Sequence, residues 1–320
     1  MKSFYTLLRT RTNLKPLLFR GYAEEIPKVS KVDVNASSTV NVSESSKADV
    51  TTTAVESGPS APEVLLTTLV DGHEDIVEIS LNRPERKNAL GKELLSQAVH
   101  QNNTARCILF RSMVPGAFCA GADLKERLEM AQDEVGPFVS RIKEAFSKIF
   151  GLPIPTIAAI DGIALGGGLE MALACDIRIA ATSARLGLTE VRLGIMPGAG
   201  GTQRLPRLIG NARAKELIFT GRILDGTAAF EKLLVNEVVK QNEQMDAAYK
   251  RALELAKEIA QQGPLAIRMA KQAINKGSQV DLQVGLEIEE GCYDTILTSE
   301  DRLEGLRAFQ EKRKPIFKGI

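Results

Sequence analysis

Ile160-Asp-Gly-Ile-Ala-Leu-Gly-Gly-Gly-Leu-Glu-Met-Ala-Leu-Ala-Cys-Asp176 is the most informative stretch of the chain. Its three consecutive glycines, at 166–168, lead into an apolar segment that we expect to form a helix from about Leu169. Glycine lets a backbone or a ligand approach closely, and a helix start offers free N–H groups and partial positive charge. The stretch lacks both the GK[ST] of a Walker loop and a GxGxxG dinucleotide turn. Glu170 falls in the first helical turn, where a carboxylate commonly just complements the helix dipole.

Two other small-residue stretches flank this one. Gly116-Ala-Phe-Cys-Ala-Gly-Ala-Asp-Leu-Lys-Glu126 predicts a tight turn into a helix, with backbone N–H groups left open. Leu188-Thr-Glu-Val-Arg-Leu-Gly-Ile-Met-Pro-Gly-Ala-Gly-Gly-Thr-Gln-Arg-Leu205 places Glu190 before a second glycine-rich segment. Alone, the first is an ordinary strand-to-helix turn, and two glutamates twenty residues apart are expected by chance among 40 acidic residues.

Apolar periodicity around these stretches predicts an α/β fold, in which strands and helices alternate before a purely helical region. The expected strands are 63–70, 75–81, 106–111, 156–160 and 177–180. The expected helices are a short one from about Gly91, then 133–150, 247–262 with Asp246 as its N-cap, 264–276, 282–297 and 299–313.

The charge of the chain is unevenly distributed. Its 41 basic and 40 acidic residues give a formal charge of +1, but residues 1–23 hold five basic residues and no acid. Residues 24–60 carry −3 and residues 61–320 carry −1. A near-neutral body argues against a protein that binds nucleic acid mainly through a large basic field.

The first 23 residues have the composition of a mitochondrial presequence. They are basic and contain apolar residues, while Arg9, Arg11 and Lys15 interrupt the apolar run that a secretory signal requires. A disordered basic tail is the alternative, and cleavage is expected just after Arg20. Residues 24–60 hold twelve serines or threonines and no aromatic residue, which predicts a disordered linker. No apolar run reaches the length of a membrane span.

The cysteine and histidine content points away from metal centres and cysteine or serine triads. The chain has four cysteines and two histidines, with no CxxC or CxH spacing. We therefore expect no metal site, and we expect the cysteines to be small buried hydrophobes in a reducing compartment. These residues are Cys107, Cys119, Cys175, Cys292, His73 and His100.

Taken together, the three stretches resemble the crotonase (enoyl-CoA hydratase/isomerase) family, and the resemblance extends over residues 63–320. The motifs that carry it are Leu81-Asn-Arg-Pro…Asn88-Ala-Leu90, Phe118-Cys-Ala-Gly-Ala-Asp-Leu-Lys125, Gly162…Gly166-Gly-Gly-Leu-Glu170…Cys175-Asp176 and Glu190…Pro197-Gly-Ala-Gly-Gly-Thr-Gln203. The resemblance implies a spiral of ββα units over 61–245. A C-terminal helical region, 246–320, is then expected to pack homo-trimers that commonly pair as hexamers.

The resemblance also implies an activity: adding water across the double bond of an enoyl-CoA thioester in the mitochondrial matrix. Closer matches within the family, at Glu134-Val-Gly-Pro-Phe-Val-Ser140, Asp123-Leu-Lys-Glu-Arg127, Ala214-Lys-Glu-Leu-Ile218 and Ser299-Glu-Asp-Arg-Leu-Glu-Gly305, imply 3-methylglutaconyl-CoA, from leucine breakdown, as the substrate. The alternatives are a broad short-chain enoyl-CoA hydratase or isomerase, and a protein that binds AU-rich RNA. CoA is part of the substrate, and no metal or redox cofactor is implied.

Four residues are implied to carry the chemistry. The backbone N–H groups of Ala122 and Gly167 match the family's oxyanion hole. Glu170 matches the base that activates water, and Glu190 matches the acid that protonates Cα. At Gly167 we expect a side chain to intrude on the substrate.

Three further residues are implied to bind the CoA portion of the substrate. Lys125 follows the oxyanion-hole turn. Phe309 and Lys312 match C-terminal residues that often reach the cofactor portion from a neighbouring subunit. For Lys312, a solvated helix face is the alternative.

Two segments depart from the family pattern. The helix from Gly91 is about six residues shorter than in close relatives, and Lys92 is its single lysine, which argues against RNA binding. Leu233 stands where the family usually has glycine. If that turn requires positive φ, leucine is strained there.

Overall fold

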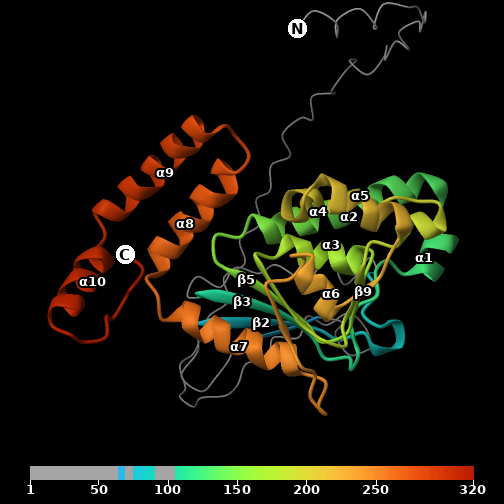
Figure 1. Ribbon diagram of the computed structural model, residues 1–320, viewed down its shortest axis with the longest axis horizontal. Helices are drawn as coiled ribbons and strands as arrows, with labels where there is room; N and C mark the ends of the chain where they lie inside the picture. Colours follow the sequence, from blue (N-terminus) through green and yellow to red (C-terminus); the bar gives the residue numbers. More distant parts are fainter. Residues whose placement is uncertain (1–63, 69–74, 91–104) are drawn as a thin grey trace, which may run out of the picture. The chain divides into compact units, whose positions relative to one another are not determined.

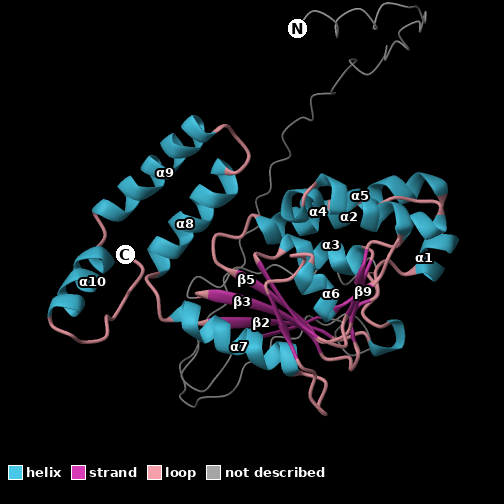
Figure 2. Ribbon diagram, viewed as in Figure 1, coloured by secondary structure: helices cyan, strands magenta, loops and turns pink. Residues whose placement is uncertain are grey.

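The computed structural model describes residues 64–68, 75–90 and 105–320 (Figure 1). In this part the chain forms two sheets and a series of helices (Figure 2). The larger sheet has the order β1-β2-β3-β5-β7-β10; β1 is antiparallel to β2, and the other neighbours are parallel. Its strands are β1 (Val64–Thr68), β2 (Ile76–Leu81), β3 (Cys107–Ser112), β5 (Thr156–Ile160), β7 (Ile177–Ala181) and β10 (Glu237–Val239).

The smaller sheet has four short strands in the order β4-β6-β8-β9. β4, β6 and β8 are parallel, and β9 is antiparallel to β8. The strands are β4 (Ala117–Cys119), β6 (Ile163–Leu165), β8 (Arg185–Gly187) and β9 (Leu224–Asp225).

The chain visits the two sheets in turn, and each visit ends in helix. β3 and β4 precede helices α1 and α2, β5 and β6 precede α3, and β7 and β8 precede α4 and α5. Because each new pair of strands adds in parallel to the previous pair, the path is a spiral of ββα units, as predicted. These helices are α1 (Leu124–Glu129), α2 (Gln132–Phe150), α3 (Gly167–Ala174), α4 (Gly201–Ile209) and α5 (Asn211–Thr220); α6 (Gly226–Glu231) follows β9.

The central strands of the larger sheet are buried on both faces, and most of their residues are apolar. On one face, side chains such as Leu109 and Ile157 pack against α7 (Ala247–Ala260). On the other, neighbours such as Phe110 and Ile160 join the main core with α2 and α3. α7 buries four alanines at four-residue intervals, and these small side chains let the helix lie close to the sheet.

Asp246 is the residue before α7, as expected, but its side chain makes no capping hydrogen bond. Asp161 performs this function from a distant position in the sequence. Its carboxylate accepts hydrogen bonds from the N–H groups of Ala248, at 2.8 Å, and Tyr249, at 3.0 Å. The prediction that Asp246 caps α7 is therefore wrong. Asp161 caps this helix instead, and only the fold brings it close to the start of α7.

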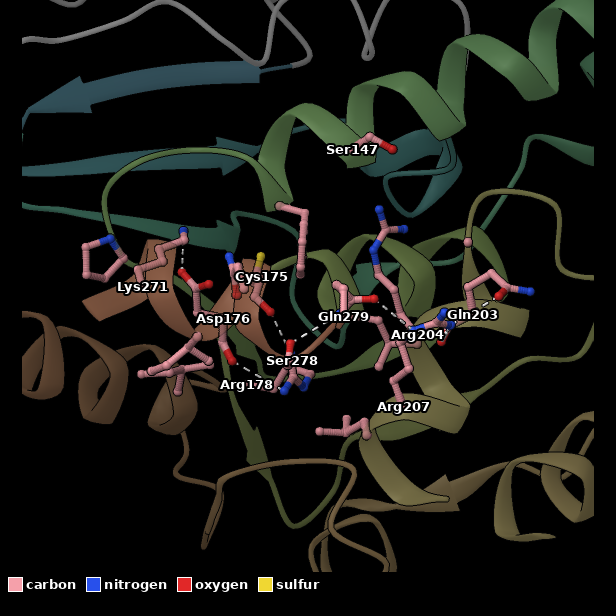
Figure 3. Close-up of a pocket in the computed structure, with 18 of the residues that line it drawn as sticks. Ser147, Cys175, Asp176, Arg178, Gln203, Arg204, Arg207, Lys271, Ser278 and Gln279 are labelled. Atoms are coloured by element: carbon pink, nitrogen blue, oxygen red, sulfur yellow. Dashed lines mark hydrogen bonds and ion pairs between the residues drawn. The ribbon is translucent and has the colours of Figure 1, made fainter. Parts of the chain in front are cut away.

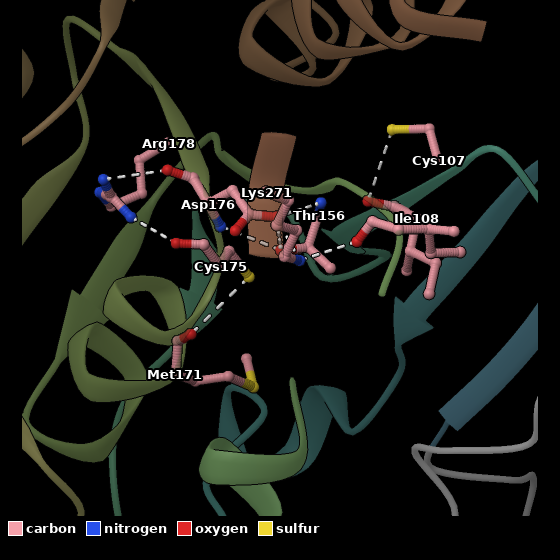
Figure 4. A network of polar contacts seen from close by, with 9 residues as sticks. Cys107, Ile108, Thr156, Met171, Cys175, Asp176, Arg178 and Lys271 are labelled. Carbon is pink, nitrogen blue, oxygen red and sulfur yellow. Dashed lines mark hydrogen bonds and ion pairs between the residues drawn. The ribbon is translucent and has the colours of Figure 1, made fainter. Parts of the chain in front are cut away.

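The last three helices are α8 (Pro264–Gly277), α9 (Leu282–Leu297) and α10 (Glu300–Gln310). α8 is joined to the core by Lys271, whose Nζ lies 2.6 Å from Oδ2 of Asp176 and donates to the Ile154 carbonyl at 2.8 Å (Figure 4). Asp176 also accepts hydrogen bonds from the N–H and hydroxyl of Thr156. No helix in the described ranges is long and apolar enough to cross a membrane.

The predicted elements mostly match those observed. The strand at 156–160 and the helix at 282–297 have the predicted bounds, and other matched elements shift by one to three residues at an end. The sequence did not predict the short strands of the smaller sheet, β10, or helices α4 to α6. The helix expected from Gly91, with Lys92, lies outside the described residues, as do the presequence and linker at 1–60.

Leu233 adopts the positive φ that the sequence comparison suggested, at 63°. Its N–H donates to the Phe230 carbonyl at 2.9 Å, and Leu234 N–H donates to Ala229 at 2.8 Å, so this turn ends α6. The Leu233 side chain is 60% exposed, whereas Leu234 is buried. Leucine therefore carries the strain of a left-handed conformation and gains little burial in return.

Candidate active site

Glu170 lies in the first turn of α3, as predicted, and its side chain is buried. Its Oε1 accepts two backbone hydrogen bonds, from Ala199 at 2.9 Å and Gly201 at 2.7 Å. Burial raises the pKa of Glu170, while the two N–H groups and the positive charge of Arg204 act in the opposite direction. One oxygen of this carboxylate is thus fixed, which orients the other.

Glu190 begins the 3₁₀ turn Glu190–Leu193 and faces the start of α3. A Cβ added to Gly166 would lie 3.4 Å from Glu190 Oε1, so this glycine makes room for the carboxyl group. Burial, together with the charge of Glu170, raises the pKa of Glu190 to about 7. Its Oε2 is buried and has no hydrogen-bond partner among the described residues. The two glutamates are therefore coupled but held in different environments.

Ala122 and Gly167 bring two backbone N–H groups close together. A Cβ on Gly167 would lie 3.9 Å from Ala122 N, and one on Gly121 would lie 3.5 Å from Gly167 N. Gly167 is the first residue of α3, so its N–H has no intrahelical acceptor. Neither amide donates a hydrogen bond to another described residue. Two free donors that converge in this way can stabilise an oxyanion.

The Ala122 N–H is aimed by a bridge to Leu90. Leu90 N–H donates to Gly121 O at 2.7 Å, and Leu90 O accepts from Asp123 N–H at 3.3 Å. Because Leu90 bonds to the residues on both sides of Ala122, the N–H of Ala122 itself points away from Leu90. Asn88 secures the turn before Leu90: its buried amide donates to the Phe118 carbonyl at 3.0 Å.

The glycines of α3 are required by close packing. A Cβ on Gly168 would overlap the Cys119 carbonyl, so α3 lies directly against β4. A Cβ on Gly167 would lie 2.8 Å from Cδ1 of Leu90. A side chain at Gly167 would therefore meet Leu90, and the expected clash with substrate stays a prediction.

The three residues expected to bind CoA are all exposed. Lys125 is exposed in the first turn of α1, whose N-terminus Asp123 caps. Phe309, in α10, is 87% exposed, and Lys312 is exposed just after that helix. Within this chain α10 lies away from α1 and α3 (Figure 1).

A cavity of 740 Å³ has Arg204 and Arg207 among its lining residues (Figure 3). Its walls come from α2, α4, α8 and the end of α3, and they include neither glutamate. Arg204 and Gly200 are among the residues that line it, so the cavity borders the segment whose N–H groups bind Glu170.

The described residues contain no cluster of histidine, cysteine and acidic side chains that could hold a metal ion. All four cysteines are free and buried, as predicted. Burial raises the pKa of the Cys107, Cys119 and Cys175 thiols to about 12. These groups are therefore uncharged at neutral pH and are poor nucleophiles.

The residues that support Glu170 cannot be identified from the sequence alone. Ala199 and Gly201 lie within the glycine-rich segment, but no local motif indicates a role for their N–H groups. The same holds for Arg204, near the end of that segment. The one available signal was the run of small residues before Arg204, which lets backbone approach a buried carboxylate.

Comparisons with known proteins agree with this geometry. A family model described as enoyl-CoA hydratase/isomerase matches residues 71–320. A mitochondrial methylglutaconyl-CoA hydratase from Mus musculus is 55% identical over 263 residues, covering 80% of this chain and 84% of that protein. A probable mitochondrial enoyl-CoA hydratase 2 from Arabidopsis thaliana is 52% identical over 275 residues, covering 84% and 89%. The crystal structure of an enoyl-CoA hydratase from Bacillus anthracis has a TM-score of 0.75 and 47% identity, covering 81% and 100%.

Proposed function

The chain belongs to the enoyl-CoA hydratase/isomerase family, and we propose that it hydrates 3-methylglutaconyl-CoA to 3-hydroxy-3-methylglutaryl-CoA. The observation that carries this proposal is the pair of unequal glutamates beside two free N–H donors. This arrangement provides the base, the acid and the oxyanion hole that hydration of an unsaturated thioester requires.

The reaction begins when the thioester carbonyl oxygen accepts hydrogen bonds from Ala122 N–H and Gly167 N–H. Glu170 takes a proton from water, and the resulting hydroxide forms a bond to Cβ. The electron pair of the double bond moves toward the thioester oxygen, where the two N–H groups stabilise its charge. Glu190 then delivers its proton to Cα, and proton exchange with solvent restores both carboxyl groups.

The environments of the glutamates support this division of work. Glu170 has two N–H donors on one oxygen and a nearby positive charge, which favour its ionised form. Glu190 has a raised pKa of about 7, which keeps a proton available near neutral pH. Because Glu170 and Glu190 interact, their titration belongs to the pair.

For the CoA portion, we propose that Lys125 contacts the substrate from the same chain, and that Phe309 and Lys312 contact it from a second copy. The exposure of Phe309, and the position of α10 away from α3 in Figure 1, support a role between subunits. This proposal requires a homo-oligomer, and we propose a trimer or a pair of trimers. Cross-linking or sedimentation of the purified protein measures this directly.

We also propose that the protein acts in the mitochondrial matrix, directed there by residues 1–23. The basic, acid-free composition of that segment and the mitochondrial names of several relatives support this location. The near-neutral charge of 61–320 does not favour RNA as the main partner.

A panel of acyl-CoA substrates tests the proposed activity. We expect 3-methylglutaconyl-CoA to be hydrated with a higher kcat/KM than crotonyl-CoA. The reverse order would favour the alternative of a broad short-chain hydratase. Absence of hydration with every enoyl-CoA, together with salt-sensitive binding of AU-rich RNA, would overturn the proposal.

A further inference from the structure

We propose that Arg204 is a positioning residue for Glu170, acting through the backbone segment between them. The proposal rests on the proposed function of Glu170 as the base. Among the described residues, Arg204 donates a hydrogen bond to the Ala199 carbonyl and to neither glutamate. Its influence passes through Ala199, which contacts both side chains.

The geometry forms a short chain of contacts. Nη1 of Arg204 donates to the Ala199 carbonyl at 3.0 Å, and the N–H of Ala199 donates to Glu170 Oε1 at 2.9 Å. The second donor to that oxygen, Gly201, is two residues further along the same segment. A guanidinium that fixes the Ala199 carbonyl therefore also fixes the donors that orient the carboxylate.

Gly200 shows how closely the guanidinium covers this segment. A Cβ on Gly200 would overlap Nη1 of Arg204, and the φ of Gly200 is +111°. The positive φ favours glycine at this position, and a side chain there would also displace the guanidinium. The Arg204 side chain thus folds back over the backbone of its own helix start, rather than extending into solvent.

The positive charge of Arg204 also acts on the Glu170 carboxylate. Its positive charge favours the ionised form of Glu170, and no described carboxylate pairs with it within 4.0 Å. Phe150 from α2 lies under its guanidinium, at 5.7 Å from the ring centroid. The other titratable groups nearby are Glu190, which acts on Glu170, and the Cys175 thiol, which acts on Arg204.

The 740 Å³ cavity gives this proposal a direct test. Arg204 lies on its wall (Figure 3), so truncation to alanine joins the space of the lost side chain to the cavity. Added guanidinium can then occupy the place of the missing group. Arg207 lines the same cavity but donates to Gln203 and not to Ala199, and Arg207→Ala is therefore the matched control.

The experiment measures kcat and KM of the full-length protein against pH, with any enoyl-CoA that the wild type hydrates. We expect Arg204→Ala to lower kcat by about 10–100-fold, because misplaced catalytic groups lose about that much, with KM changed less. The midpoint of its acidic limb should move to higher pH. Guanidinium chloride, at concentrations below those that unfold the protein, should restore kcat relative to sodium chloride.

The proposal is overturned if Arg204→Ala keeps the wild-type pH profile, or if guanidinium fails to raise its kcat. Arg207→Ala should show neither the pH shift nor the rescue, and a matching response there would also overturn it. If Arg204→Ala fails to fold, Arg204→Lys replaces it: the retained charge should keep the acidic limb in place while kcat falls. A wild-type kcat in Arg204→Lys would count against the proposal. A wild type that hydrates no enoyl-CoA would instead refute the proposed function.

Discussion

Replacement of Glu190 by glutamine is expected to stabilise the protein while it removes the proposed acid. Glu190 has a pKa raised from 4.5 to about 7 by burial and by the charge of Glu170. Since the folded state holds a proton that the unfolded state releases, ionisation opposes folding as pH rises through this interval. Glutamine keeps the shape of the side chain and cannot ionise.

The magnitude follows from the pKa. A carboxyl group whose pKa rises from 4.5 to about 7 on folding destabilises the folded state by at most about 3 kcal/mol above pH 7. Because Glu190 is partly exposed, solvent screening reduces the expected gain to about 1–2 kcal/mol. Below pH 4.5 the group is protonated in both states, so the gain disappears there.

The assay is urea unfolding at a fixed protein concentration, from pH 5 to pH 8.5, for the wild type and Glu190→Gln. The free energy of unfolding of the variant should increase relative to the wild type as pH rises. Glu144→Gln is the control, since Glu144 is 66% exposed and pairs with Lys148 on α2. That change should alter stability by under about 0.5 kcal/mol at every pH. A difference between Glu190→Gln and wild type that stays constant with pH would refute the reasoning.

Three other outcomes follow from the same geometry. The kcat of the wild type should decline as pH rises above about 7, because Glu190 must carry a proton; a decline beginning below pH 6 would contradict this. Leu233→Gly should raise the free energy of unfolding by about 0.5–1 kcal/mol. Positive φ costs leucine about 1–2 kcal/mol, and the larger conformational entropy that glycine loses on folding offsets part of this gain. Urea titration beside Leu233→Ala, which keeps the strain, checks this, and equal stability of the two variants would argue against it. Gly167→Ala should lower kcat about 100-fold by displacing an oxyanion donor, and Leu90→Ala in the same chain should restore part of the loss; no recovery in steady-state kinetics would exclude Leu90 as the cause.

Sequence reasoning succeeded where local patterns reflect burial. All five residues of β5 are buried, and the four from Ile157 to Ile160 form a continuous apolar run that can be recognised without the fold. α9 is long enough to show helical periodicity, with Asp281 as a true side-chain cap. β6, by contrast, has three residues, too few to show any periodicity. The strands of the smaller sheet therefore could not be predicted from the sequence, although most strands of the larger sheet could.

The candidate site shows the same limit. Glu170 and Glu190 were selected by motif resemblance, because their spacing alone carried no information. The partners of Glu170 are 29 and 31 residues away in sequence, and the fold alone brings their N–H groups to one oxygen. The contribution of Arg204 through Ala199 is likewise a tertiary contact that no local pattern reveals.

In the proposed mechanism, Glu170 and Glu190 together perform the hydration. The most direct measurement of this is kcat/KM for 3-methylglutaconyl-CoA with wild type, Glu170→Gln, Glu190→Gln and the double variant. Each single change should reduce kcat/KM by about 100–10,000-fold, and the double variant should be little worse, because the two residues act as a unit. Hydration by the folded double variant at the wild-type rate would contradict the account.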